Sequence, residues 1–379
     1  MTGSGALDCP HISGAALSRR KRVFPQLIDC VWGVLPSFVA RSCFDIRYSC
    51  LGFCGEGLTV ASFSSVEVCA GAGGQAVGLD RAGFDHWACV EIDPAACATL
   101  RANRPNWRVI EQDLRLWEPD ESLTGVDLLA GGVPCPPFSI AGAQLGRADE
   151  RDLFPEMIRL ADELKPRAIL IENVRGLLGR KFEGYRADIL ADFKELDYEF
   201  CGWELFDSAD FGVPQSRPRA LLVLARPEVA IHFRWPTPNT RRKTVGQVLR
   251  REMARGGWKG AAAWAKSANG VAPTLVGGSK KHGGADLGPT RARAAWQRLG
   301  VDGVALADAP PAPGHIGMPR LTVEMAALIQ GFPKDWKFQG RKTAAYRQVG
   351  NAFPPPVAEA VGRCIAEALA SADDDQTRQ

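Results

Sequence analysis

The sequence has few of the features that mark zinc-binding, disulfide-stabilised or membrane-spanning proteins. Its 379 residues include eleven cysteines, but no Cys-x-x-Cys pair occurs, and the five histidines are scattered. A structural zinc site is therefore not expected. No apolar run approaches the ~20 residues that cross a bilayer, and the basic cluster at 19–22 lacks the flanks of a signal peptide. We expect a cytoplasmic protein with reduced cysteines, no metal and no membrane contact.

The chain also lacks a large net charge, since it carries only +3 at neutral pH. Its basic residues are nevertheless concentrated in one part. Residues 226–318 contain fifteen Lys and Arg against five acidic residues, so this part carries +10 and the remainder −7. A basic segment beside a near-neutral body favours a lobe that binds a polyanion, although a solvated basic face is the alternative.

The first 64 residues have a composition unlike the rest. Five of the eleven cysteines lie before residue 55, and the stretch has neither a helical nor an alternating period. We expect residues 1–64 to be disordered, or to lie upstream of a natural start near Val60, because bacterial genes also start at valine codons. A basic arm that contacts DNA, or a small metal-binding cap, is the alternative.

From Val66 onward, short apolar strands alternate with helical stretches. The predicted strands are 66–70, 87–92, 108–111, 126–130, 168–171 and 220–225. The predicted helices are a stretch ending near residue 82, then 94–102, 153–164, 322–330 and 356–370. Alternation of this kind predicts an α/β fold, with a Rossmann-like, mostly parallel sheet and helices on both faces.

A glycine-rich segment, 71–74, follows the first predicted strand. Glycines let a ligand lie against the backbone, where a Cβ would collide. Glu91 ends the second strand ~20 residues further on, where a carboxylate can accept both hydroxyls of a ribose. Asp113 follows the third strand, where it can accept from an adenine amino group. A dinucleotide site or a tight turn is the alternative for the glycines, and a helix cap for Asp113.

Cys135 differs in its setting from an inert cysteine buried in a strand. It lies between Pro134 and Pro136, directly after the fourth predicted strand. The prolines leave this loop few conformations, and functional sites in parallel sheets lie at the carboxyl ends of the strands. The setting therefore favours a displayed nucleophile over a structural cysteine.

Five segments occur in the order seen in DNA (cytosine-5)-methyltransferases, and the chain resembles this family from about residue 66 to 370. They are 66–74, 131–139, Glu-Asn-Val at 172–174, Gln-Ser-Arg-Pro-Arg at 215–219 and Gly-Asn at 350–351. Arg320-Leu-Thr with Glu324, followed by Gln-Gly-Phe-Pro at 330–333, resembles the family's late block. The resemblance implies a site-specific enzyme that methylates C5 of a cytosine flipped out of double-stranded DNA, with S-adenosylmethionine as its cofactor.

The resemblance also assigns the catalytic residues. Cys135 would add to C6 of the cytosine, which breaks the aromaticity of the ring and makes C5 nucleophilic. Glu172 would transfer a proton to N3. Arg219 and Arg217 correspond to the pair that holds the cytosine O2 and orders the catalytic loop, and Asn173 would orient that loop.

The cofactor residues implied by the resemblance lie in five places along the chain. They are Cys69, Ala70, Gly71, Gly73, Gly74, Glu91, Ile92, Asp113, Leu114, Pro134, Asn351 and Ala352. The family usually has phenylalanine at the position of Cys69, where the ring contacts adenine. Cysteine offers a smaller surface, for which Ile92 could compensate.

The family's recognition region includes the basic segment, so we expect a small irregular target-recognition domain at 226–319. A catalytic domain at 65–225 precedes it. A C-terminal segment at 320–371 returns to the catalytic domain, and residues 372–379 form a disordered tail. Expected DNA contacts are Ser139, Gln215, Thr274, Leu275, Lys280 and Lys281, with the lysines on phosphates. We expect a monomer in a restriction–modification system, with a cognate restriction endonuclease acting separately. An RNA methyltransferase on the same scaffold, a catalytically inactive binding module and a nicotinamide dehydrogenase are the alternatives.

Overall fold

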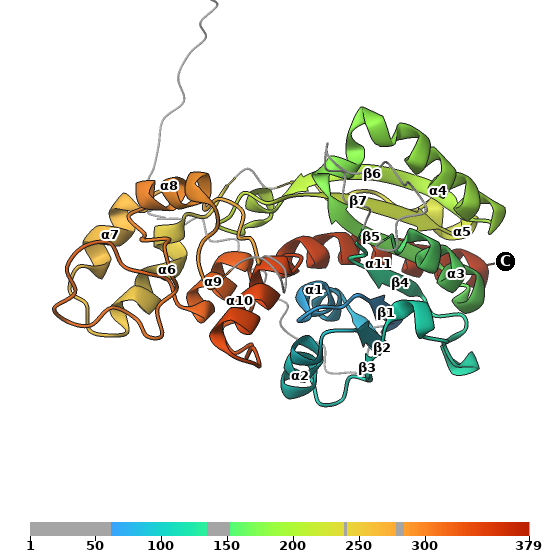
Figure 1. The fold of residues 1–379 in the computed structure, drawn as a ribbon. Coiled ribbons are helices and arrows are strands. Elements are labelled where there is room, and N and C mark those ends of the chain that lie inside the picture. Colours follow the sequence, from blue (N-terminus) through green and yellow to red (C-terminus); the bar gives the residue numbers. More distant parts are fainter. Residues whose placement is uncertain (1–61, 135–151, 239–240, 278–283, 379) are drawn as a thin grey trace, which may run out of the picture. The chain divides into compact units, whose positions relative to one another are not determined.

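The computed structural model describes residues 62–134, 152–238, 241–277 and 284–378, which lie in one compact unit (Figure 1). The expected extension up to residue 61, and four of the expected site residues, lie outside the described residues. These four are Cys135, Ser139, Lys280 and Lys281. Within the described ranges, no helix has the length and apolarity needed to cross a membrane.

A seven-stranded sheet with the order β3-β2-β1-β4-β5-β7-β6 organises the catalytic part (Figure 1). The strands are β1 Phe63–Val68, β2 Phe84–Glu91, β3 Val109–Glu111, β4 Leu128–Gly131, β5 Ala168–Val174, β6 Glu199–Asp207 and β7 Pro218–Ala225. The pairs among β1 to β5 are parallel, whereas β7 is antiparallel to β5 and to β6. The expected mostly parallel sheet is confirmed. The strand order reverses between β1 and β4, and such a reversal opens a crevice at the carboxyl ends of the strands.

Helices cover both faces of this sheet, as expected. On one face lie α3 (Phe154–Leu164) and α4 (Glu183–Glu195), and on the other α1 (Gly74–Arg81), α5 (Pro227–Ala230) and α11 (Pro355–Thr377). Alternate residues of β4 and β5 serve the two faces: Leu129 and Ile169 pack under α3, whereas Leu128 and Leu170 pack under α11. This period of two is that of a strand buried on both sides.

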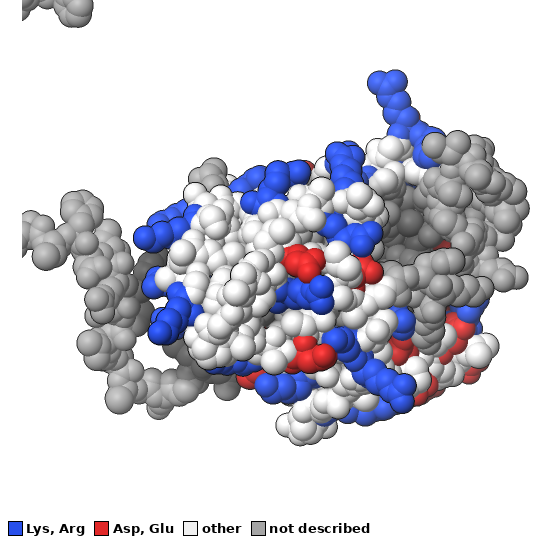
Figure 2. All heavy atoms as spheres, turned by 60° about the vertical axis from the view of Figure 1, so that its left-hand side comes forward, with Lys and Arg blue, Asp and Glu red and all other residues white. Residues whose placement is uncertain are grey.

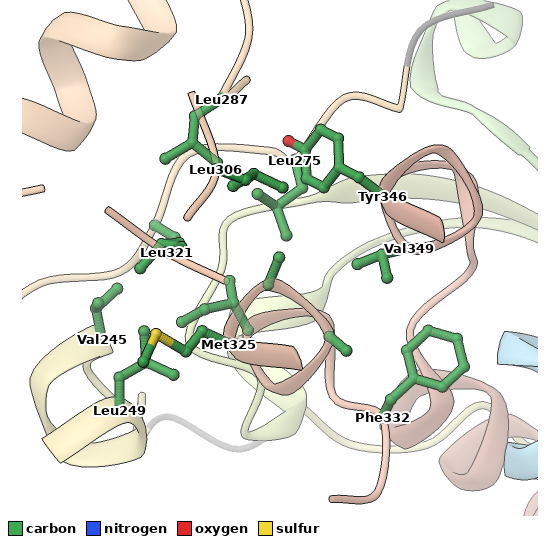
Figure 3. Close-up of a cluster of buried hydrophobic side chains, with 14 of the residues drawn as sticks. Val245, Leu249, Leu275, Leu287, Leu306, Leu321, Met325, Phe332, Tyr346 and Val349 are labelled. Carbon is green, nitrogen blue, oxygen red and sulfur yellow. The ribbon is translucent and has the colours of Figure 1, made fainter. Parts of the chain in front are cut away.

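A third apolar core joins residues 226–319 to the C-terminal helices. Its helices are α6 (Val245–Ala254), α7 (Ala261–Ser267), α8 (Thr290–Arg298), α9 (Val323–Gln330) and α10 (Lys342–Asn351). Leu100 of α2 (Pro94–Asn103) also belongs to it, so this core reaches the edge of the sheet. Figure 3 shows Met325 of α9 and Tyr346 of α10 among leucines from the neighbouring loops. The loops within residues 226–319 and the helices α9 and α10 therefore pack on one shared core.

The observed boundaries differ from the expected ones in several places. β1 begins at Phe63, and the amide and hydroxyl of Ser64 donate to the Asp127 carboxylate, so the last residues of the expected extension belong to the sheet. α11 continues to Thr377, and most of the expected disordered tail is therefore helical. α4 and β6 were not predicted, because α4 buries fully only Ile189 and Phe193 and β6 lies half-exposed at the sheet edge. Short 3₁₀ helices lie at Leu114–Leu116, Glu121–Leu123, Arg175–Leu178, Arg180–Phe182 and Ser208–Phe211.

Candidate active site

Two cavities meet at the carboxyl ends of β1, β4 and β5. The larger has a volume of about 600 Å³ and the smaller of about 230 Å³. Gly132, Glu172 and Asn351 line both of them. The two cavities therefore adjoin each other at the crevice that the strand order predicts.

Seven of the twelve expected cofactor residues line the smaller cavity. They are Cys69, Ala70, Gly71, Gly74, Glu91, Asn351 and Ala352. Gly73, Ile92, Asp113, Leu114 and Pro134 are not among its lining residues, and the Ile92 side chain is 60% exposed. Asp113 caps the following 3₁₀ helix by accepting from the Arg115 amide at 3.1 Å, and the Arg115 side chain lowers the pKa of its carboxyl. The structure thus shows Asp113 in the cap role that the sequence left open.

The glycine turn is packed so closely that side chains would not fit. Gly73 has a φ of +86°, and a Cβ there would lie 2.8 Å from Leu100 and 2.9 Å from the Trp336 ring. A Cβ on Gly74 would lie 2.2 Å from the carbonyl oxygen of Phe353. The Trp336 indole donates to the Ala72 carbonyl at 3.1 Å. The C-terminal segment therefore packs directly on the turn, and glycine is required for this approach.

Glu91 is held at the end of β2 by three backbone amides. Its Oε2 accepts from Gly71 at 2.7 Å, and its Oε1 accepts from Ile92 at 2.9 Å and Asp93 at 2.7 Å. Burial raises the pKa of the Glu91 carboxyl, and the three amides act in the opposite direction. The carboxylate is thus fixed in the wall of the smaller cavity, where it can accept further hydrogen bonds.

Four of the five expected catalytic residues line the larger cavity: Glu172, Asn173, Arg217 and Arg219. Antiparallel pairing of β5 and β7 sets Arg219 opposite Val174, diagonally across from Glu172 on the same face. The Arg219 Nε lies 2.6 Å from the Glu172 Oε1, and both side chains are largely buried. A Cβ on Gly132 would come within 3.1 Å of the other Glu172 oxygen, so glycine leaves room for the carboxylate.

Asn173 fixes the chain that leads to Cys135. Its Nδ2 donates to the Val133 carbonyl at 2.9 Å. The next carbonyl, that of Pro134, accepts from the Leu153 amide at 3.2 Å, and Pro134 lines the larger cavity. Pro134 and Leu153, which lie on either side of segment 135–151, are therefore linked by a backbone hydrogen bond beside this cavity.

Arg217 has a different environment from Arg219. It is 2% exposed, and its guanidinium donates to the carbonyls of Leu275 at 2.7 Å and Gly350 at 2.9 Å. Burial, together with the charge of Arg219, lowers the pKa of Arg217 to about 9. Arg217, which directly precedes β7, thus links the start of this strand to the 274–277 segment and to the end of α10.

The described DNA-contact candidates lie largely inside the protein. Gln215 is fully buried; its Nε2 donates to Gln330 at 2.5 Å and its Oε1 accepts from the Leu275 amide at 2.7 Å. Leu275 is 1% exposed. Thr274 lines the larger cavity, and its hydroxyl donates to the Ser216 carbonyl at 2.8 Å. Gln215 thus holds the 274–277 segment through the Leu275 amide, and the Leu275 side chain anchors that segment in the apolar core.

Several residues that line the cavities were missed by sequence reasoning. Glu67, Gln75, Arg347 and Phe353 line the smaller cavity, and Lys181 lines the larger one. Arg347 lies one helical turn before Asn351 on α10, but this helix was not among those predicted, so the spacing gave no usable signal. Glu67 and Gln75 also carry no signal, since a strand acid and a helical glutamine are ordinary surface residues in most sequences.

This chain is similar to one family model and to several known proteins. The model of the family described as C-5 cytosine-specific DNA methylase matches residues 63–367. The Type II methyltransferase M.NaeI of Lentzea aerocolonigenes is 55% identical over 315 residues, which cover 81% of this chain and 76% of that protein. M.NgoMIV of Neisseria gonorrhoeae is 54% identical over 321 residues, covering 81% and 98%. The solved structure of the methyltransferase EhMeth of Entamoeba histolytica has the same fold, with a TM-score of 0.56 at 15% identity over 83% of this chain and 99% of that one.

The chain therefore belongs to the C-5 cytosine-specific DNA methylase family, as a DNA (cytosine-5)-methyltransferase of the bacterial restriction–modification type.

Proposed function

We propose that the chain transfers a methyl group from S-adenosylmethionine to C5 of a cytosine flipped out of duplex DNA, through a covalent bond between Cys135 and C6. The observation that carries this proposal is the meeting of the two cavities at Gly132, Glu172 and Asn351. A cofactor in the smaller cavity and a base in the larger would face each other at these residues. A stacked cytosine is not accessible to a thiolate, so the base must leave the helix.

The smaller cavity fits the cofactor in shape and charge. Its glycine turn offers backbone without side chains, and the fixed Glu91 carboxylate suits the two hydroxyls of a ribose. Asp93 and Glu172 also line it, which favours a ligand with positive charge. When bound, S-adenosylmethionine supplies an electrophilic methyl group on a sulfonium.

The residues of the larger cavity act on the base. The Cys135 thiolate adds to C6, the π electrons of the C5=C6 bond shift to form C4=C5, and those of the C4=N3 bond move to N3. Glu172 donates a proton to N3, which neutralises the charge that arrives on the ring. Arg219 holds Glu172 through its Nε and binds the cytosine O2 as a permanently charged group. After C5 has taken the methyl group, a base, for which water is a candidate, would remove the C5 proton. The C5=C6 bond then re-forms as the Cys135 thiolate leaves, and N3 returns its proton to Glu172.

Residues 226–319 serve as the target-recognition domain in this proposal. Figure 2 shows Lys and Arg side chains spread over the face on which these residues lie, with fewer acidic ones among them. Such a surface suits the phosphates of DNA. Ser139 and Thr274 contact the DNA, Lys280 and Lys281 bind phosphates, and Gln215 and Leu275 act as supports. The enzyme acts as a monomer and protects host DNA from a separate cognate endonuclease.

The test traps the covalent intermediate on DNA in which every cytosine is 5-fluorocytosine, so the target sequence need not be known. Fluorine is not lost as a cation, and the Cys135–C6 bond should therefore persist. Wild-type protein with S-adenosylmethionine should form an adduct that survives denaturing electrophoresis. Cys135→Ser should form none while it still binds S-adenosylhomocysteine.

Cys201→Ser provides the matched control, because Cys201 lies on β6 and lines neither cavity. This variant should form the adduct at the wild-type level. An adduct of wild-type abundance on Cys135→Ser would exclude Cys135 as the nucleophile.

A further inference from the structure

Residues 175–182, which directly follow β5, contribute to one wall of the larger cavity. This segment contains Arg175, Arg180 and Lys181 but no acidic residue. All three of these residues are exposed, and Lys181 lines the cavity together with Gly176 and Phe182. A concentration of positive charge therefore borders the cavity on the side of the catalytic part.

The segment is fixed to the apolar core of the catalytic part. Leu177 and Phe182 are buried in the core that also contains the apolar side chains of α3 and α4. The guanidinium of Arg186, on α4, donates to the carbonyls of Leu177 at 2.6 Å and Gly179 at 3.1 Å. The three cations thus lie on a rigid support, and a ligand that binds them need not order the backbone.

None of these three cations is paired with an acid in the part of the chain that the structure describes. The Lys181 ammonium lies 5.3 Å from the centre of the Phe182 ring, a contact that leaves its N–H donors for an oxygen ligand. Two other cations line the same cavity, but Arg217 donates to two backbone carbonyls and Arg219 is paired with Glu172. Lys181 therefore has the binding capacity for an anion that these arginines have already used.

The anion that suits this position is a phosphate of DNA. A cytosine that enters the larger cavity stays bonded to its sugar, so the phosphates on either side of that sugar come to the rim of the cavity. Phosphate contacts of this kind fix the register of the nucleic acid without reading its sequence. Lysine suits the task, because it binds phosphate as a point charge on a flexible stem.

We propose that residues 175–182 bind backbone phosphates of the strand that carries the flipped cytosine, through Arg175, Arg180 and Lys181. The proposal rests on the proposed function, and it adds a contact from the catalytic part to those expected from residues 226–319. Residues 274–277, which come from that other part, line the same cavity. The strand is then held by both parts of the chain, one at each wall of the cavity.

The test follows the KM for DNA as the salt concentration rises. The substrate is long, unmethylated DNA of mixed sequence, and transfer of a labelled methyl group counts only those complexes in which a cytosine has entered the cavity. Lys181→Gln should lower the slope of log KM against log salt by about 0.9, the value of one phosphate contact. Adding Arg175→Gln and Arg180→Gln should lower it by up to ~2.7. The loss should appear in KM more than in kcat, because the phosphates do not change in the reaction.

Lys194→Gln is the matched control, because Lys194 is also exposed but lies near the other end of the sheet. Its partner Glu199 is opposite Ala225, which in turn is opposite Ala168, the first residue of β5. This variant should keep the wild-type slope. Lys181→Arg should keep it as well, because the charge is retained.

Binding of S-adenosylhomocysteine checks that the variants fold, and its affinity should stay at the wild-type level, because none of the three cations lines the smaller cavity. A wild-type slope in the triple variant would overturn the proposal, and so would an equal fall in slope for Lys194→Gln. A wild-type protein that methylates no DNA would instead overturn the proposed function.

Discussion

The two cavities share three lining residues but differ in the sign of the charge around them. Lys181, Arg217 and Arg219 line the larger cavity, together with Glu172. The smaller one is lined by Arg347, by the acids Glu91, Asp93 and Glu172, and by Glu67, whose pKa is raised by burial so that its carboxyl keeps a proton. This difference matches ligands of opposite charge, a polyanion on one side and a sulfonium on the other.

Backbone groups hold two opposite charges, one from each cavity, near the same edge of the sheet. Glu91 is held by three backbone N–H groups, and Arg217 by two backbone C=O groups. Neither charge depends on a mobile counter-ion, because backbone dipoles are fixed by the fold. Glu172, which belongs to both cavities, is instead held by a side chain, that of Arg219. Glu172 is therefore the charged residue through which the larger cavity contacts the smaller one.

Replacing Glu172 by glutamine tests this coupling and should have the largest effect. The amide keeps the shape but cannot transfer a proton, so single-turnover methylation with labelled S-adenosylmethionine should slow by about 10²- to 10⁴-fold. Affinities for S-adenosylhomocysteine and DNA should change little. Glu195→Gln, at an exposed acid that ends α4, should leave the rate unchanged. A Glu172→Gln rate near that of the wild type at neutral pH would remove Glu172 from the mechanism.

Arg217→Met sharpens the contrast between the two arginines. It removes the hydrogen bonds to Leu275 and Gly350 and should lower the free energy of unfolding by about 3 kcal/mol, measured by urea denaturation. The matched variant Arg219→Met removes an ion pair at the cavity surface, so it should reduce turnover more than stability. If Arg217→Met is as stable as the wild type, Arg217 is not a structural brace.

The parts that sequence reasoning could predict are contiguous motifs at strand ends. The glycine turn, Glu91 and the Glu172–Asn173 pair each follow or end an apolar strand, and strand order then brings them together. A motif does not reveal which neighbour a side chain will face. Gln215 belongs to a conspicuous motif, yet it is buried against Gln330, which lies 115 positions away in the sequence.

The residues that were missed depend on packing between distant segments. Arg347 and Phe353 reach the smaller cavity because the C-terminal segment folds back onto the glycine turn, and the close fit of Gly74 against Phe353 is a tertiary contact. Glu67 was missed for another reason. A carboxyl in a strand is usually exposed, and only the surrounding helices make this one buried.

Glu67 gives the smallest expected effect, and it concerns the smaller cavity alone. Burial raises the pKa of its carboxyl well above the usual value, so the folded protein keeps a proton that the unfolded chain loses. The stability gained from this proton is complete below the unfolded pKa and decreases as the pH rises toward the folded pKa. As the pH rises from about 4.3, the usual pKa of glutamate, toward the raised pKa of Glu67, the free energy of unfolding should fall by up to ~1.4 kcal/mol per pH unit.

Glu67→Gln removes this dependence, because the amide has the shape of the protonated acid and does not titrate. Urea denaturation of the ligand-free protein between about pH 5 and pH 8 should give a flatter slope for the variant than for the wild type. Glu91 also has a raised pKa, but it is present in both proteins, so the difference in slope isolates Glu67. Arg217, with a pKa of about 9, keeps most of its charge over this range and is present in both proteins, so it does not affect the difference in slope. Equal slopes would mean that Glu67 ionises in the folded protein as it does in the unfolded chain. Burial of its carboxyl in the ligand-free cavity would then not change the pH dependence of the free energy of unfolding.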